Sequence, residues 1–187
     1  MAHTEPVSDL RLEEIVQKYR QLGDAAFRNA YPHPMLVRRD ARDGESEVAF
    51  HTAFMSRDML RQTSELGQPD TLTDATREPG QQVLKVAKRA GGPFQDRIGI
   101  GRARNADVSL PLPRVSKYHG YFSWSLDGSE YFVTDAGSKN GTSVGGSLVP
   151  AKQAVPVSNG TEISFGPYRF LFYTPDGFAD LIASRAR

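Results

Sequence analysis

The chain has 187 residues, of which 39% are hydrophobic, so it is long enough for one domain with a sizeable core and an extension. Cysteine is absent, which excludes disulfides and thiolate metal sites. Acidic residues interrupt the first thirty positions and no apolar run approaches the length of a membrane span, so we expect a cytoplasmic protein with no signal peptide and no membrane contact.

The net charge of +1 at pH 7 hides an uneven distribution along the chain. Residues 1–80 contain 10 Lys and Arg against 14 Asp and Glu, whereas residues 81–175 contain 11 against 6. The second part is therefore basic and suited to an anionic ligand. Charge alone does not distinguish a phosphopeptide from a nucleic acid.

Apolar residues at helical spacing predict a largely helical segment over 9–30, with Ser8 as its cap and the proline-containing stretch 31–34 as its end. Further along, apolar runs at 35–37 and 48–55 flank a polar stretch that contains Asp-Gly, a dipeptide suited to a tight turn. This pattern predicts a hairpin. We assign residues 1–55 to an N-terminal extension made of a helix and a hairpin.

Residues 56–82 are polar, contain Gly and Pro, and lack a sustained period, so we interpret them as a linker with one short helix at 58–66. From Val83 onward, short runs rich in Val, Ile, Phe and Tyr alternate with turn residues at the spacing typical of an all-β sandwich. The expected strands are 83–89, 97–100, 107–110, 120–126, 130–135, 142–144, 155–157, 161–165 and 168–174.

The predicted fold class is mostly β: an antiparallel β-sandwich domain at 83–175 with a helical or mixed N-terminal extension. The tail, residues 176–187, is expected to form a short closing helix. Strands this short offer no deep catalytic cleft, so function should lie in the loops at one end of the sandwich.

Three of these loops carry the residues with distinctive chemistry: 101–107, 115–119 and 135–142. They contain arginine and lysine together with hydroxyl and amide donors, which are the groups that a phosphate dianion needs. They offer neither an activated nucleophile nor a metal cage. We therefore expect a non-enzymatic reader of phosphorylated protein, with no catalytic residue, no cofactor and no metal.

Residues 81–174 contain a series of short elements in a fixed order: Gly101-Arg102, Asn105-Ala106-Asp107, Leu110, Val115-Ser116-Lys117-Tyr118-His119, Phe122, Asp135, Gly137-Ser138-Lys139-Asn140-Gly141-Thr142, Asn159-Gly160, Ile163 and Phe165-Gly166. This pattern resembles the forkhead-associated (FHA) domain, a β-sandwich module that binds phosphothreonine in partner proteins. The chain departs from the family pattern at Thr161, where an acidic residue is common, and at Gly145-Gly146, where Asn-Gly is more usual; both positions lie outside the phosphate-contacting ones.

The resemblance implies a phosphopeptide-binding site in these loops. Arg102 would contact the phosphate, Ser116 would donate its hydroxyl to another phosphate oxygen, and Asn140 would hydrogen-bond the peptide backbone beside the phosphothreonine. The other implied residues are rim contacts at Lys117, Ser138 and Lys139, and structural supports of the loops at Gly101, His119, Gly137 and Gly141.

Other functions stay open from the sequence. A protein-interaction scaffold with the same fold that binds independently of phosphate is the main alternative. A nucleic-acid binder would use the basic charge, but the aromatic residues of 118–124 alternate as strand residues should, rather than forming a stacking platform. Ser116, His119 and Asp135 are the residue types of a catalytic triad, yet a triad also needs an oxyanion hole and a pocket, and the resemblance implies a structural histidine.

The implied partner is a threonine-phosphorylated protein, with a Ser/Thr protein kinase as the writer of the mark. The linker adds one further hypothesis, because Thr71 has Asp74 three residues after it, and FHA domains often read that position. A phosphorylated Thr71 could occupy the domain of its own chain or of a second copy. The simpler interpretation is a solvated linker.

Overall fold

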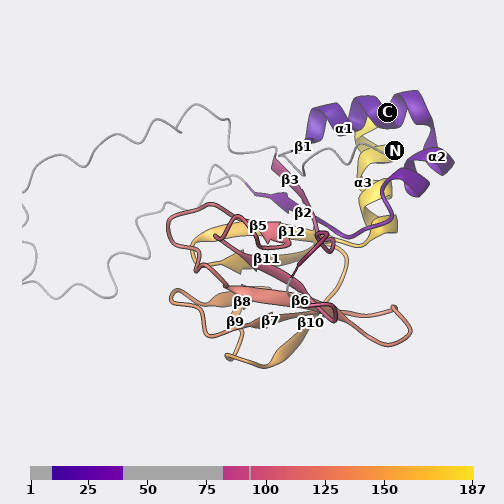
Figure 1. Cartoon of the computed structure of the whole chain (residues 1–187). Coiled ribbons are helices and arrows are strands. Elements are labelled where there is room, and N and C mark those ends of the chain that lie inside the picture. Colours follow the sequence, from indigo (N-terminus) through magenta and orange to yellow (C-terminus); the bar gives the residue numbers. More distant parts are fainter. Residues whose placement is uncertain (1–9, 40–81, 93) are drawn as a thin grey trace, which may run out of the picture. The chain divides into compact units, whose positions relative to one another are not determined.

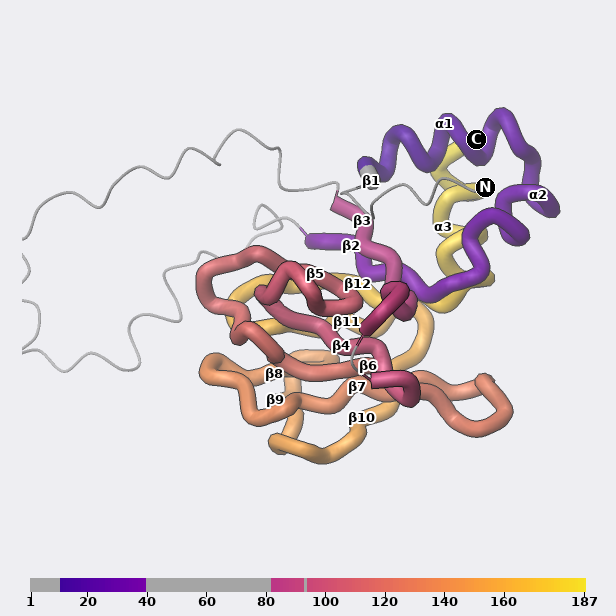
Figure 2. Tube along the Cα trace, in the orientation of Figure 1, coloured from indigo at the N-terminus to yellow at the C-terminus, as the bar shows by residue number. Residues whose placement is uncertain are grey.

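The computed structural model of the chain describes residues 10–39, 82–92 and 94–187. The strands in these residues form two sheets, and three helices lie together beside them (Figures 1 and 2). The mostly β class and the sandwich predicted from the sequence are confirmed. The linker with its short helix, and the second arm of the predicted hairpin, lie outside the described residues.

The larger sheet, sheet A, has seven strands in the order β1-β3-β2-β12-β11-β8-β9, and all of its neighbours pair antiparallel. Its strands are β1 (Leu10–Arg11), β2 (Met35–Arg38), β3 (Gln82–Lys85), β8 (Thr142–Val144), β9 (Ser147–Leu148), β11 (Thr161–Phe165) and β12 (Tyr168–Tyr173).

The smaller sheet, sheet B, has five strands in the order β10-β7-β6-β4-β5. Its strands pair antiparallel except β4 and β5, which are parallel. The predicted antiparallel sandwich therefore contains one parallel pair. These strands are β4 (Ile98–Gly101), β5 (Val108–Ser109), β6 (Gly120–Trp124), β7 (Tyr131–Asp135) and β10 (Ala154–Val157).

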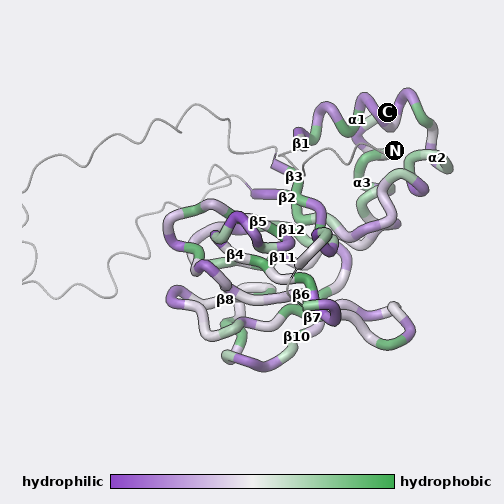
Figure 3. The backbone as a smooth tube through the Cα atoms, viewed as in Figure 1, coloured by the Kyte–Doolittle hydropathy of each residue, from purple (hydrophilic) through white to green (hydrophobic). Residues whose placement is uncertain are grey.

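One hydrophobic core fills the space between the two sheets. Residues two apart along the longer strands enter this core, which is the period that predicted the strands. Figure 3 shows hydrophobic positions along the strands of both sheets. Ile98, Ile100 and Phe122 enter from sheet B, and Ile163 and Phe170 enter from sheet A. The odd-numbered residues of β4 and β6 therefore lie on the outer face of sheet B.

The predicted N-terminal helix is two helices, α1 (Leu12–Leu22) and α2 (Asp24–Ala30), separated at Gly23. Gly23 has φ +74°, a left-handed conformation that ends α1 and that glycine adopts at low cost. The first helix begins at Leu12 with Arg11 as its N-cap residue, whereas the predicted cap, Ser8, lies outside the described residues. The predicted tail helix is α3 (Pro175–Ala186), whose N-cap Thr174 accepts a hydrogen bond from the Gly177 backbone N–H.

Strand β2 corrects the interpretation of residues 35–37 as one arm of a local hairpin. Met35–Val37 pair with β3 on one side and with β12 on the other, so both edges of β2 are occupied inside sheet A. The described part of the N-terminal segment thus belongs to the same compact unit as the sandwich. Local sequence period cannot identify such partners, because both lie far away along the chain.

A second hydrophobic cluster joins the three helices to the outer face of sheet A. It contains residues from α1, α2, α3, β2 and β3: Leu12, Ile15, Phe27, Met35, Val37, Val83, Phe178, Ala179 and Ile182. The helices lie together at one side of the sandwich (Figure 1). Among the described residues, none of the helices has the length and hydrophobicity needed to cross a bilayer.

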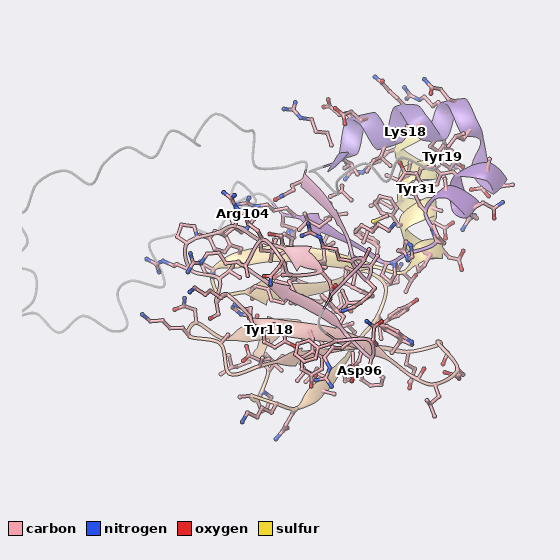
Figure 4. The ribbon with its side chains drawn as sticks, viewed as in Figure 1. Lys18, Tyr19, Tyr31, Asp96, Arg104 and Tyr118 are labelled. Carbon is pink, nitrogen blue, oxygen red and sulfur yellow. The ribbon has the colours of Figure 1, made fainter. Side chains whose placement is uncertain are left out.

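Strand register separates two ends of sheet A. At one end, Thr142 of β8 pairs with Phe165 of β11, directly after the loop 135–142. At the other end, Tyr173 of β12 pairs with Met35 and leads into α3. We call these the loop end and the helical end. Figure 4 shows Arg104 at the loop end and Lys18 and Tyr31 at the helical end.

Candidate functional site

The three loops predicted to carry function are tied together by hydrogen bonds at the loop end. The Arg102 backbone N–H donates to the Ser116 carbonyl at 2.8 Å. The Lys139 backbone N–H donates to Ser116 Oγ at 3.0 Å, and Asn140 Nδ2 donates to the Arg114 carbonyl at 2.7 Å. Each of the three loops therefore fixes the position of another.

Gly101 allows the first two loops to meet. A Cβ at this position would overlap the Lys117 carbonyl oxygen and lie 3.0 Å from the Ser116 carbonyl oxygen. These are backbone atoms, which cannot move aside without breaking the loop. The close approach of this backbone requires glycine here, and the absence of a side chain brings Arg102 beside Ser116.

His119 is fully buried and connects the second loop to the third. Its Nδ1 accepts from the Ser116 backbone N–H at 3.2 Å, which fixes the tautomer with the proton on Nε2, and Nε2 lies 3.0 Å from the Gly141 carbonyl oxygen that accepts this proton. Burial lowers the pKa of His119 below its ordinary value, although the Gly141 carbonyl and Asp135 oppose this effect. The ring is a neutral structural cross-link.

Asp135 shapes the third loop from inside. Its Oδ1 accepts from the backbone N–H groups of Gly137 and Ser138, and its Oδ2 accepts from the hydroxyls of Ser138 and Thr142 at 2.7 and 2.6 Å. Burial raises the pKa of this carboxyl, but the hydrogen bonds from Thr142, Ser138 and Gly137 outweigh burial and lower it overall. The Asp135 carboxylate therefore stabilises the third loop and is fully occupied by donors of that loop.

Three of the predicted contact residues keep donors that no described residue uses. Arg102 donates through Nε to the Val115 carbonyl at 3.2 Å, which leaves its two Nη groups without a partner in the described part of the chain. Ser116 Oγ accepts from Lys139, and its own proton is likewise unused. Asn140 is exposed and uses one N–H of its side-chain amide on Arg114, so its oxygen and second N–H stay available.

The remaining predicted residues divide into two groups. Lys117 and Lys139 are exposed and form no ion pair within the described ranges, so they place positive charge at the rim. Ser138 donates its only hydroxyl proton to Asp135, so its geometry is that of a loop support and not of a phosphate donor. Gly137 and Gly141 have φ +89° and +74°, which the turns of the third loop need.

Sequence reasoning missed one element that shapes the first loop. The side chain of Asp107 is 2% exposed and accepts from Lys88 Nζ at 2.8 Å and from the backbone N–H groups of Arg89 and Gly99. Burial raises the pKa of Asp107, but Lys88 and the two backbone donors lower it overall. The family pattern includes Asp107, which was a signal that this residue shapes the loop. Lys88 lies far from Asp107 in sequence, and no pattern indicated that the two would pair.

The geometry does not suit nucleophilic catalysis. Both ring nitrogens of His119 are engaged, one by the Ser116 backbone and one by the Gly141 carbonyl, so neither is placed to take the Ser116 hydroxyl proton. Within the described ranges, His, Asp and Glu side chains form no cluster of three or more that could hold a metal ion.

Comparisons with known proteins identify the family of the domain. The family model described as "FHA domain" matches residues 98–166. The chain is 34% identical over 137 residues to the oxoglutarate dehydrogenase inhibitor of Corynebacterium jeikeium, an alignment that covers 69% of this chain and 92% of that protein. The chain belongs to the FHA family.

Two further proteins match part of the chain. The chain is 37% identical over 102 residues to the glycogen accumulation regulator GarA of Mycolicibacterium smegmatis, which covers 51% of this chain and 61% of that protein. A solved structure of Mycobacterium tuberculosis EmbR in complex with a low affinity phosphopeptide matches with 27% identity and a TM-score of 0.38, over 44% of this chain and 21% of that one.

Proposed function

We propose that this FHA protein is a non-enzymatic, phosphothreonine-dependent binding module that regulates a partner protein. The observation that carries the proposal is the set of unused donors on three hydrogen-bonded loops, namely the Arg102 guanidinium, the Ser116 hydroxyl and the Asn140 amide. A relative named as an enzyme inhibitor and one named as a regulator support a role through binding rather than catalysis.

Each donor has a distinct role in the proposal. The Nη groups of Arg102 present a planar fork that matches two phosphate oxygens, and Ser116 reaches a third. Lys117 and Lys139 add charge that attracts a dianion of roughly −1.5 to −2. Asn140 has both a donor and an acceptor left, which is what the backbone of an extended peptide requires.

The donors are preorganised, which raises their value to a ligand. Arg102 is held at Nε by the Val115 carbonyl, and Ser116 Oγ is held by Lys139. Little conformational entropy is then lost on binding. Two or three hydrogen bonds to a charged group, each contributing about 1.5–3 kcal/mol, give a moderate interaction that removal of the phosphate switches off.

The test is isothermal calorimetry of the full chain against a phosphothreonine peptide library. We expect selected peptides to bind, their dephosphorylated forms not to bind, and Arg102→Ala to lower the affinity about 100-fold. Arg185→Ala, an exposed arginine in the last turn of α3, is the matched control and should bind like the wild type. Equal binding of the dephosphorylated peptides would favour a phosphate-independent scaffold and overturn the proposal.

The proposal includes a Ser/Thr kinase that phosphorylates the partner. It also includes a cytoplasmic location, which the absence of cysteine supports. It also includes Thr71, outside the described residues, as a target whose phosphorylated form occupies the site of its own chain or of a second copy. Phosphorylated protein should then bind a selected peptide more weakly, and Thr71→Ala should restore binding. Unchanged affinity and unchanged oligomeric state after phosphorylation would remove this part.

A further inference from the structure

A pocket lies at the helical end, where α1 and the end of α2 meet the outer face of sheet A. Its volume is about 510 Å³, which is within the range of about 300–1,000 Å³ typical of small-molecule sites. Side chains of α1, of the end of α2, of β2 and of β3 line it, and none of the three loops contributes. We call it the helical-end pocket.

Helical spacing places three side chains of α1 along one wall of the helical-end pocket. Lys18, Gln21 and Leu22 follow one another at steps of three and four residues, so they lie on one face of the helix. Leu22 is 47% exposed although it is apolar, so its side chain is open to an apolar group. Figure 4 shows Lys18 of α1 and Tyr31, which follows α2, and both line the pocket.

Sheet A supplies an apolar and a charged side chain to the same pocket. Met35 of β2 pairs with Lys85 of β3, so the two side chains lie on the same, outer face of the sheet. Met35 is buried, whereas Lys85 is half-buried. Val83, two residues before Lys85, belongs to the hydrophobic cluster on this face. Lys85 therefore lies where that cluster ends and the pocket begins.

The two cations of the pocket have no counter-charge among the described residues. Lys18 and Lys85 form no ion pair there, and Glu14, one turn before Lys18, is not its partner. The carboxylates of α2 and α3 all pair with Arg28 instead. An anion in the pocket therefore meets two ammonium groups that no described carboxylate neutralises.

Tyr31 adds a hydrogen-bond donor in a fixed position. Its ring stacks on the buried Phe27 ring, with centroids 4.4 Å apart. Burial raises the pKa of Tyr31, so its hydroxyl keeps its proton at neutral pH. Neither this hydroxyl nor the side-chain amide of Gln21 has a hydrogen-bond partner in the described part of the chain. The polar groups of the pocket are thus all available to a ligand.

We propose that the helical-end pocket binds a small organic anion that carries an apolar body. The anionic head pairs with Lys18 and Lys85 and accepts a hydrogen bond from the Tyr31 hydroxyl. The body packs against the apolar side chains that line the pocket, Leu22, Ala30 and Met35. A neutral apolar molecule leaves both ammonium groups unpaired, and a bare anion leaves the apolar wall in water, so the ligand needs both parts.

The experiment is an amide NMR titration of the full chain with octanoate, phenylbutyrate and octyl phosphate. Octanamide lacks the charge of these probes, and acetate lacks their apolar body. We expect saturable shifts confined to α1, the end of α2, β2 and β3. Octanamide should bind at least about tenfold more weakly than octanoate, and acetate should not bind. The tighter of octanoate and octyl phosphate identifies the head group.

Substitutions test the two parts of the pocket separately. Lys18→Met and Lys85→Met should each weaken octanoate binding about tenfold, and Ala30→Phe, which fills the pocket, should prevent it. Lys18 is exposed, so its substitution tests the charge even if Lys85→Met disturbs β3. Lys152→Met is the matched control, because Lys152 is an exposed lysine in the turn before β10 and should bind octanoate like the wild type.

Three results would overturn the inference: no saturable shift with any of the three anions, equal binding of octanoate and octanamide, or wild-type binding in both lysine variants. Shifts centred on the three loops would also overturn it, because they would place the anion at the loop end. The inference does not rest on the proposed function. Phosphothreonine peptides should bind Lys18→Met and Ala30→Phe as they bind the wild type, so the two sites fail or succeed independently.

Discussion

Two arginines at opposite ends of the molecule show how the same residue type is fully paired in one place and keeps open donors in another. Arg28 of α2 is surrounded by Asp24, Asp176 and Asp180, so each of its nitrogens has a carboxylate partner. Arg102 faces no carboxylate among the described residues, and only its Nε is engaged, by a backbone carbonyl. A guanidinium that the fold has already paired holds elements together, whereas one that is oriented but unpaired is ready for a ligand.

The difference extends to the residues behind each arginine. At the helical end, aromatic rings fill a cluster that joins α1, α2 and α3 to sheet A. At the loop end, buried polar groups, His119 and Asp135, hold the loops through directed hydrogen bonds. Changes at the helical end should therefore alter stability alone, while changes behind the loops should alter both stability and binding.

The largest expected effect on stability belongs to Phe27→Ala. Phe27 is fully buried, with ring centroids 4.4 Å from Tyr31 and 5.1 Å from Tyr19. Removing the ring should lower the free energy of unfolding by about 3–5 kcal/mol, measured by urea denaturation. Phosphopeptide affinity of the folded fraction should be unchanged. If the alanine variant fails to fold, Phe27→Leu replaces it. A lower phosphopeptide affinity of the Phe27→Leu protein would mean that the helical end and the loop end are coupled.

The next effect is that of His119→Ala, which should alter both properties. The substitution leaves the Ser116 N–H and the Gly141 carbonyl without their partner in a buried site, at a cost of about 3 kcal/mol. Phosphopeptide affinity should fall about tenfold although His119 touches no ligand, because Ser116 and the third loop shift. His33→Ala, at the helical end, is the matched control. Unchanged affinity in a folded His119→Ala protein would contradict the supporting role.

These two ends also differ in how far the sequence could predict them. The strands of the sandwich follow from period and turn residues, and the proposed contact residues Arg102, Ser116 and Asn140 follow from the family pattern. The pairing of strand β2 could not be predicted, because its partners β3 and β12 are distant in sequence and its apolar run fits the arm of a local hairpin equally well.

The sequence also could not predict which loop hydroxyl donates its proton within the protein. Ser116 and Ser138 are both loop serines beside lysines, yet Ser116 keeps its proton while Ser138 donates its proton to Asp135. The residue types and spacing are the same kind of signal in both cases. Only the position of the Asp135 carboxylate separates the serine whose proton stays unused from the serine whose proton is donated within the loop.

A smaller effect should appear in the pH dependence of stability, measured without peptide because phosphate itself titrates near pH 6. Burial keeps the pKa of folded His119 below its ordinary 6.5, so the unfolded chain binds the proton first and stability falls as the pH decreases below about 6.5. The slope for one group is at most about 1.4 kcal/mol per pH unit.

His33 must be separated from His119 in that measurement. Burial and Lys85 lower the pKa of His33 too, so it contributes a slope of the same sign from the helical end. Urea denaturation of His33→Asn at pH 7.5 and 5.5 should retain part of the loss, and the imidazole NMR titration should place the pKa of His119 below 6.5. A pKa of His119 at or above 6.5 would contradict its neutral role.

The smallest effect belongs to Arg28→Gln, although Arg28 forms ion pairs with three carboxylates. The side chain is 33% exposed and its three carboxylates are more exposed still, so water and salt screen the pairs. Hydrogen bonds to Asp24 and Asp180 raise the pKa of Arg28, which keeps it charged at every working pH.

The midpoint of thermal unfolding of Arg28→Gln should fall by about 4 °C or less, and this difference should shrink between about 0.01 M and 1 M salt. Affinity for a selected phosphopeptide should match the wild type, since the pairs join α2 to α3 at the helical end. A loss of affinity as large as that of Arg102→Ala would mean that pairing does not separate structural arginines from binding ones in this fold.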